Sequence, residues 1–176
     1  STVGIVGFGR IGKQVAKRLI GFNAKTIYTD IIEIEKDIEE ELQASRVTLE
    51  VLLKESDFVT LHVPLTDATH HLIDKEALDM MKPGATLINC ARGPVVSELA
   101  LIDAMKNRRL GGAGLDVFEI EPPPKPNPFA DFENVVLTPH HAPGTRDTMM
   151  IKFREIFANA DRFFSGDRME NEVSLI

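Results

Sequence analysis

The sequence contains little cysteine and few aromatic residues, and it has no long apolar run. Cys90 is the only cysteine, tryptophan is absent, and there is one tyrosine. A single cysteine excludes an intramolecular disulfide and is typical of a reducing compartment, so we expect a cytoplasmic protein. No stretch approaches the roughly 18 apolar residues of a membrane helix, and we recognise no secretory signal, so we expect no membrane partner.

Basic tracts and metal-ligand patterns are also lacking. The formal net charge is −7 and no basic segment offsets it, so we expect no nucleic-acid partner. The five histidines occur without a thiol pattern, and adjacent histidines usually point in different directions, so we expect no metal site. A chain of 176 residues corresponds to one domain and is long enough to bury a substantial core.

The first dozen residues combine an apolar run with a glycine pattern. Residues 3–6 predict a short buried strand, and Gly7, Gly9 and Gly12 follow it with G-x-G-x-x-G spacing. Apolar residues at helical spacing begin directly afterwards, so the glycines lie where a strand turns into a helix. Gly7 permits the tight turn, Gly9 lets a pyrophosphate approach the backbone, and Gly12 lets the helix pack against the sheet. The helix N-terminus attracts the phosphate.

A second predicted strand, residues 25–29, leads into Asp30. A carboxylate at this position can accept hydrogen bonds from the hydroxyls of an adenosine ribose. Ile31 and Ile32 follow without an arginine to receive a 2′-phosphate, so the pattern favours NAD over NADP. Taken alone, these features also fit a module that binds FAD or S-adenosylmethionine, or a plain glycine-rich turn with an ordinary turn aspartate.

The rest of the chain alternates between predicted strands and helices. Further strands are expected at residues 45–47, 58–63, 85–89, 111–117 and 135–138. Helices are expected at residues 10–20, 33–43, 49–55, 73–81, 97–108 and 146–164. This alternation predicts βαβ units with right-handed crossovers, and hence an α/β fold with a doubly wound parallel sheet of the Rossmann type. We assign residues 1–176 to one dinucleotide-binding domain.

The unusual polar residues all follow predicted strands, so we expect them at one edge of the sheet. They are Asp30, His62, Arg92, Asp116, Glu121 and His140. Taken singly, each residue also has an ordinary structural explanation. Arg92 could be a turn residue in a surface ion pair, Glu121 could be a solvated charge in a loop, and His140 could cap a helix. Together they suit hydride transfer between a nicotinamide and a 2-hydroxy acid. Arginine clamps the carboxylate, histidine exchanges a proton near neutral pH, and glutamate beside it favours the imidazolium.

Three later stretches carry a resemblance to a known family. They read NCARGPVV at residues 89–96, GGAGLDVFEIEP at 111–122 and VVLTPH at 135–140. They closely resemble the D-isomer-specific 2-hydroxyacid dehydrogenases, which include 3-phosphoglycerate dehydrogenases and glyoxylate/hydroxypyruvate reductases. The resemblance covers essentially the whole chain and implies an enzyme that transfers a hydride between NAD(H) and a small D-2-hydroxy or 2-keto acid. The acid would be of the 3-phosphoglycerate, glycerate or glyoxylate type, and the whole enzyme would be a homodimer.

The resemblance also implies roles for individual residues. Arg92 would clamp the substrate, Glu121 would be the partner of the histidine, and His140 would be the catalytic acid and base. Asp116 would hold the nicotinamide side, and Val63-Pro64 would lie along the cofactor. The full set of expected NAD-binding residues is Gly7, Gly9, Arg10, Ile11, Gly12, Asp30, His62, Val63, Pro64, Cys90, Ala91, Arg92, Asp116, His140 and Ala142.

Two features depart from the family pattern. After the histidine the family usually has an aliphatic or small residue, then Ala or Gly, then Gly, whereas this chain reads His141-Ala142-Pro143-Gly144. Family members are also much longer, so we expect the substrate domain to be absent and the chain alone to be inactive. Some relatives of this family act as transcriptional corepressors, so the alternative is a regulatory protein that senses nicotinamide cofactors.

Overall fold

The computed structural model describes residues 1–142 and 144–172. Pro143, one of the departures from the family pattern, lies outside the described residues. The chain forms two compact units, Ser1–His140 and His141–Ile176, and each is described by itself. The assignment of residues 1–176 to one dinucleotide-binding domain therefore remains a prediction.

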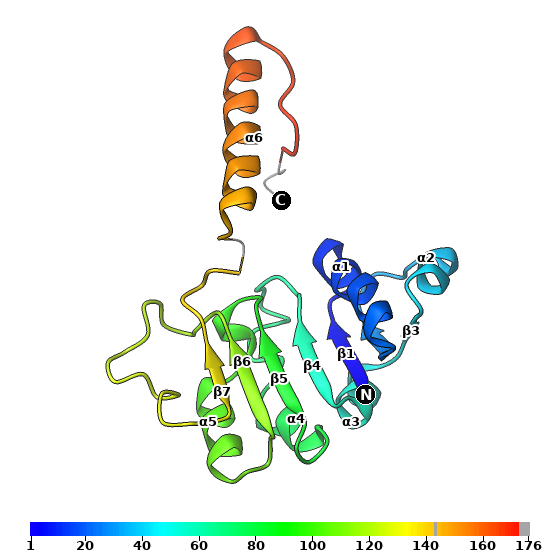
Figure 1. The fold of residues 1–176 in the computed structure, drawn as a ribbon, viewed down its shortest axis with the longest axis vertical. Coiled ribbons are helices and arrows are strands. Elements are labelled where there is room, and N and C mark those ends of the chain that lie inside the picture. Colours follow the sequence, from blue (N-terminus) through cyan, green and yellow to red (C-terminus); the bar gives the residue numbers. More distant parts are fainter. Residues whose placement is uncertain (143, 173–176) are drawn as a thin grey trace. The chain divides into compact units, whose positions relative to one another are not determined.

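The first unit is built on a seven-stranded sheet with the strand order β3-β2-β1-β4-β5-β6-β7 (Figure 1). Its strands are β1 (Thr2–Val6), β2 (Lys25–Thr29), β3 (Ala44–Arg46), β4 (Phe58–Leu61), β5 (Thr86–Asn89), β6 (Gly112–Leu115) and β7 (Val135–Leu137). Every neighbouring pair is parallel. The strand order reverses between β1 and β4, so the predicted doubly wound parallel sheet is confirmed.

Five α-helices connect these strands. They are α1 (Arg10–Leu19), α2 (Lys36–Glu41), α3 (Leu49–Glu55), α4 (Lys75–Met80) and α5 (Glu98–Lys106). Short 3₁₀ turns follow at Ile20–Phe22 and Gly93–Val95. The local sequence explains where three of these helices begin. The side chains of Thr48, Asp74 and Ser97 each accept a backbone N–H at the N-terminus of α3, α4 and α5, respectively. The five helices predicted for this unit are all present; α3 has the predicted bounds, and the other four are shorter than predicted.

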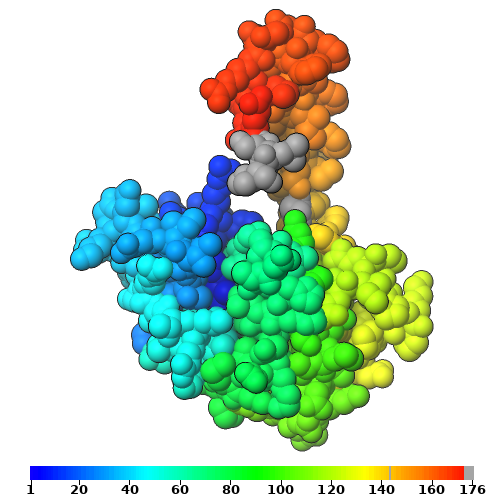
Figure 2. Space-filling model, turned by 180° about the vertical axis from the view of Figure 1, so that it is seen from behind, coloured from blue at the N-terminus to red at the C-terminus, as the bar shows by residue number. Residues whose placement is uncertain are grey.

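Helices cover both faces of the sheet. The helices α3, α4 and α5 pack against one face, where they bury Leu52, Leu78 and Leu101, and Figure 2 looks onto this side in light blue to green. A second buried cluster forms between the sheet and α1 and α2. In this cluster Phe8 is fully buried and stacks on Tyr28 with ring centroids 3.9 Å apart. Because Phe8 turns inward from the glycine pattern, its side chain anchors that turn to the core.

The second unit consists of helix α6 (Arg146–Ser165) and the segment after it. Thr145 caps the start of α6 through the N–H of Thr148, and Gly166 ends it at φ 77° in the left-handed region. The following segment folds back, since Asn159 exchanges two hydrogen bonds with the backbone of Glu170. No helix in the described part of the chain is long and apolar enough to cross a membrane.

Candidate active site

The glycine turn joins the carboxyl end of β1 to α1. Gly7 has φ +91°, and a side chain there would lie 2.6 Å from the carbonyl oxygen of His62. A side chain at Gly12 would overlap the carbonyl of Gly7, so helix and turn are in close contact. A Cβ at Gly9 would meet no atom within 4 Å. The three glycines therefore have different surroundings, and the open space lies beside Gly9, where a ligand can approach the backbone.

The N-terminus of α1 is suited to an anion. Gly9 is its N-cap, and among the residues that the structure describes no side chain caps this helix and none of its first-turn residues is acidic. Arg10 and Ile11, the first two residues of α1, are exposed. Free N–H groups and the positive end of the helix dipole thus face the open space at Gly9, which fits a pyrophosphate.

Asp30 lies directly beside this turn at the end of β2. Its Oδ2 accepts the backbone N–H of Phe8 at 2.5 Å, and its Oδ1 accepts the N–H of Ile32 at 2.9 Å. Arg46, at the end of β3, donates to the carbonyl of Asp30 at 2.8 Å. Each carboxylate oxygen retains a second acceptor site for a ribose hydroxyl. Asp30 therefore also holds the glycine turn, a role that the sequence pattern did not reveal.

His62 follows β4 directly, and Val63 and Pro64 continue from it. Its Nε2 lies 3.0 Å from Oγ1 of Thr60, and burial lowers the pKa of His62 below its ordinary value. The imidazole is accordingly neutral near pH 7, which suits a residue that lines a site more than one that transfers protons.

Two hydrogen bonds of the Asn89 side chain hold the turn that carries Arg92. Asn89, buried at the end of β5, donates through Nδ2 to the carbonyl of Arg92 at 3.0 Å and accepts the N–H of Ala91 at 3.0 Å. Arg92 itself is exposed, and its guanidinium donates to the carbonyl of Ala91 at 2.6 Å. Cys90 lies within this turn, and its thiol pKa is raised by partial burial and by the nearby charge of Asp116.

Asp116 follows β6 and connects it to the end of β7. The carboxylate is buried and accepts the hydroxyl of Thr138 at 2.6 Å, while its backbone N–H donates to the carbonyl of Asn89 at 3.0 Å. Thr138 in turn precedes Pro139-His140. Asp116 therefore fixes the direction in which the chain leaves β7. No local sequence pattern indicates these contacts of Asn89 and Thr138.

Glu121 and His140 form a hydrogen-bonded pair. Nδ1 of His140 lies 2.7 Å from Oε2 of Glu121, and Oε1 of Glu121 accepts the N–H of Phe118 at 3.0 Å. The bond to His140 is the main reason that the pKa of Glu121 is lowered, and the Phe118 N–H and the charges of His140 and Arg92 add to it. His140 has φ +51°, an uncommon conformation for a residue other than glycine, of the kind that clusters at functional sites.

The structure brings almost all predicted site residues to one edge. They follow the carboxyl ends of β1, β2, β4, β5, β6 and β7, and in a parallel sheet those ends share one edge. Ala142 belongs to the second unit, so its place relative to this edge is not described. The arrangement combines the glycine turn with its open backbone at Gly9, the carboxylate of Asp30 beside it, an exposed arginine and a histidine–glutamate pair.

Comparison with known proteins agrees with this geometry. Residues 1–142 match the family described as D-isomer specific 2-hydroxyacid dehydrogenase, NAD binding domain. The chain belongs to this family. The resemblance found in the sequence is therefore confirmed, and residues 1–142 constitute its NAD-binding domain.

Its relatives include both reductases and dehydrogenases. The chain is 47% identical to a glyoxylate reductase of Korarchaeum cryptofilum, over 98% of the chain and 52% of that protein. It is 39% identical to a D-3-phosphoglycerate dehydrogenase of Methanocaldococcus jannaschii, over 99% of the chain and 33% of that protein. The chain thus spans about half the length of the curated glyoxylate reductases that it matches.

Solved structures show the same fold. The holo form of D-mandelate dehydrogenase from Rhodotorula graminis aligns with a TM-score of 0.90 and 38% identity, over 98% of this chain and 52% of that one. D-lactate dehydrogenase with NAD⁺ from Lactobacillus jensenii aligns with a TM-score of 0.91 and 30% identity, over 98% of this chain and 55% of that one.

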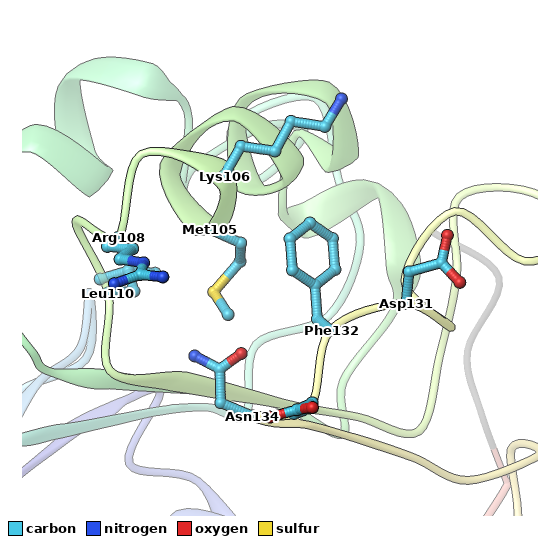
Figure 3. Close-up of a pocket in the computed structure, with 8 residues that line it drawn as sticks. Met105, Lys106, Arg108, Leu110, Asp131, Phe132 and Asn134 are labelled. Atoms are coloured by element: carbon cyan, nitrogen blue, oxygen red, sulfur yellow. The ribbon is translucent and has the colours of Figure 1, made fainter.

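A separate hollow of about 690 Å³ lies elsewhere on the NAD-binding domain (Figure 3). Its lining comes from the end of α5 and from the segment before β7, namely Met105, Lys106, Arg108, Leu110, Asp131, Phe132, Glu133 and Asn134. These residues precede β6 and β7, so the hollow lies at the amino edge of the sheet, away from the site described above. The described residues also contain no group of three or more His, Cys, Asp or Glu side chains that could hold a metal ion.

Proposed function

We propose that this NAD-binding domain serves an oxidoreductase that transfers a hydride between NAD(H) and a D-2-hydroxy or 2-keto acid. The observation that carries the proposal is the Glu121–His140 pair, 2.7 Å apart, at the same sheet edge as Arg92 and the glycine turn. An acid–base histidine, an exposed arginine and a dinucleotide site are the three parts that this reaction requires.

These residues would hold NAD along the carboxyl edge of the sheet. Gly7, Gly9 and Gly12, with Arg10 and Ile11, would receive the pyrophosphate. Asp30 would accept the ribose hydroxyls. The remaining members of the expected set are His62, Val63, Pro64, Cys90, Ala91, Arg92, Asp116, His140 and Ala142, and they would line the nicotinamide half. When bound, the cofactor supplies or accepts the hydride.

The protein residues then handle the acid and its proton. The guanidinium of Arg92 would pair with the substrate carboxylate and polarise the adjacent carbonyl. With Nδ1 of His140 bonded to Glu121, its Nε2 would give a proton to the carbonyl oxygen during reduction and take it back during oxidation. Glu121, ionised near neutral pH, would stabilise the imidazolium and fix the plane of the ring.

We further propose a small 2-keto acid of the glyoxylate or hydroxypyruvate type as substrate, ahead of the phosphorylated acids. The glyoxylate reductase named above is more similar to this chain than the 3-phosphoglycerate dehydrogenase, at 47% against 39% identity. The whole enzyme is proposed to be a cytoplasmic homodimer with no nucleic-acid partner, on the grounds of the single cysteine, the acidic charge and the family resemblance. No observation favours the regulatory alternative.

Cofactor choice gives one test of the proposal. The Asp30 carboxylate would repel a 2′-phosphate, so NAD should bind more tightly than NADP in a calorimetric titration. Asp30→Ser, which removes that charge, should narrow the difference between the two nucleotides. Equal or tighter binding of NADP by the unchanged chain would refute the assignment.

Catalysis requires the half that the chain does not cover. We would join residues 1–176 to the remaining half of the Korarchaeum cryptofilum glyoxylate reductase and assay NADH oxidation with glyoxylate, hydroxypyruvate and 3-phosphohydroxypyruvate, with the intact relative as a positive control. Turnover with the first two acids is expected. A folded chimera that binds NADH without reducing any of the three acids would argue against the proposed activity.

A further inference from the structure

A reciprocal contact joins the start of α5 to the loop that follows β6. Glu98, the first residue of α5, and Glu119, in the loop after β6, exchange hydrogen bonds in both directions. The N–H of Glu98 donates to Oε1 of Glu119 at 2.8 Å, and the N–H of Glu119 donates to Oε1 of Glu98 at 2.7 Å. Each carboxylate thus accepts the backbone N–H of the other residue, while burial and the nearby Glu119 raise the pKa of Glu98.

A third side chain closes this contact. Nε2 of His71 lies 3.1 Å from the same Oε1 of Glu119, and both side chains are partly buried, at 38% and 29% exposure. The backbone N–H of His71 donates to the carbonyl of Pro94 at 2.8 Å. His71, Glu98 and Glu119, which we call the glutamate clamp, therefore tie together three segments of the chain.

The clamp surrounds a backbone contact that tolerates no side chain. Gly93 packs against the peptide between Phe118 and Glu119, and a Cβ at Gly93 would overlap the carbonyl of Phe118. Gly93 directly follows Arg92, and Glu119 stands two residues before Glu121. This contact therefore fixes the backbone next to Arg92 against the backbone three residues before Glu121.

Resting on the function proposed above, we propose that Glu98 and Glu119 are positioning residues that hold Arg92 in register with the Glu121–His140 pair. They touch neither of these side chains directly and act through the backbone of Gly93 and Phe118. The N–H of Phe118 is the link on one side, since it donates to Oε1 of Glu121 at 3.0 Å. If the clamp is lost, the peptide at Phe118 is free to move away from Gly93, and Glu121 loses its fixed orientation toward His140.

The test uses this chain and reads the imidazole of His140 directly. ¹⁵N NMR distinguishes an imidazole protonated on Nδ1, as the bond to Glu121 requires, from one protonated on Nε2. Glu119→Ala and Glu98→Ala should each keep NAD affinity, because Gly9 and Asp30 belong to other contacts, and should each lose the Nδ1-bonded state of His140. Glu119→Gln keeps the acceptor oxygen for the N–H of Glu98, so this variant should retain the Nδ1-bonded state of His140. Glu76→Ala, on the exposed start of α4, is the matched control and should leave it unchanged.

Each outcome decides the proposal. Loss of the Nδ1-bonded state in both alanine variants, with NAD binding preserved and Glu119→Gln like the unchanged chain, supports it. Variants that bind NAD and keep the His140 signal of the unchanged chain overturn it. Failure of both alanine variants to fold would make the clamp a structural element and would also overturn it. Absence of NAD binding in the unchanged chain would instead count against the proposed function.

Discussion

Nδ1 of His140 lies 2.7 Å from Oε2 of Glu121, and this hydrogen bond joins the end of β7 to the loop that follows β6. The two residues are 19 positions apart in the sequence and meet because the parallel strands that precede them end at the same edge. The bond fixes which ring nitrogen of His140 faces the carboxylate, and it leaves the other nitrogen for the proton exchange proposed above.

Replacement of His140 should impair the chemical step. In the chimera described above, His140→Ala removes the proton donor and should lower kcat roughly 10²–10⁴-fold, with little change in NADH affinity. Steady-state kinetics with glyoxylate measure this. Glu76→Ala, on the exposed start of α4, is the control. A His140→Ala variant with near-native kcat would remove the acid–base assignment.

Replacement of Glu121 should change the pH profile. Glu121 has a lowered pKa, so it carries a negative charge beside the His140 imidazole near neutral pH. Glu121→Gln removes that charge, and the rate of keto-acid reduction should fall off at a lower pH than in the unchanged chimera. A pH series of kcat/KM measures the displacement. A profile that stays in place would mean that Glu121 does not act on the proton.

A second carboxylate predicts how stability depends on pH. Asp57 contacts Nζ of Lys82 at 2.5 Å and the N–H of Thr2 at 2.7 Å, and the hydrogen bond to Lys82 is the main reason that its pKa is lowered. A carboxylate whose pKa is lowered in the folded state stabilises the protein at any pH above its ordinary pKa. That stabilisation is lost as the pH falls through the folded-state pKa. Asp57→Asn should therefore have a lower free energy of unfolding than the unchanged chain near pH 7, and this gap between the two proteins should shrink on acidification.

Urea unfolding across an acid-to-neutral series measures that gap. Glu50→Gln provides a comparison, because Glu50 also has a pKa lowered by a lysine, Lys54, but lies in an exposed pair on one helix. Exposed pairs of this kind contribute little to stability, so the change in its gap with pH should be smaller. A gap at Asp57 that does not vary with pH would contradict the prediction.

The chain alone should bind NAD but reduce no keto acid at an appreciable rate. Arg92 and His140 are both exposed here, whereas hydride transfer requires a substrate held close to the nicotinamide in a water-poor cleft. NADH consumption by the purified chain with glyoxylate, hydroxypyruvate and 3-phosphohydroxypyruvate tests this. Robust turnover with any of them would show that one half suffices, or that a second copy supplies the other wall.

Much of the fold could be predicted because its signals are local. The buried strand before Gly7, the glycine turn and the N-cap residues Thr48 and Ser97 each act within a few positions, and the structure has these elements where the sequence predicts them. Element ends were less predictable. The helix expected at residues 33–43 is reduced to α2, which begins after Glu35 without a side-chain cap.

The site was predictable as far as it follows from topology. Residues that follow the carboxyl ends of parallel strands must lie at the same edge of the sheet. For this reason Asp30, Arg92 and His140 could be grouped from the sequence alone. The contacts between loops could not be predicted in this way. Glu98 and Glu119 are 21 residues apart, and their pairing depends on how closely Gly93 and Phe118 approach, which no periodicity encodes.

If the carboxyl edge of this chain binds NAD through the open space at Gly9, a side chain at that position should block the cofactor. A Cβ at Gly9 or at Gly21 would meet no atom within 4 Å, so both positions tolerate a side chain structurally, but only Gly9 faces the proposed pyrophosphate. Calorimetric titration with NAD should show binding by the unchanged chain and by Gly21→Val, and loss of binding by a folded Gly9→Val. Equal NAD affinity in all three proteins would contradict the account.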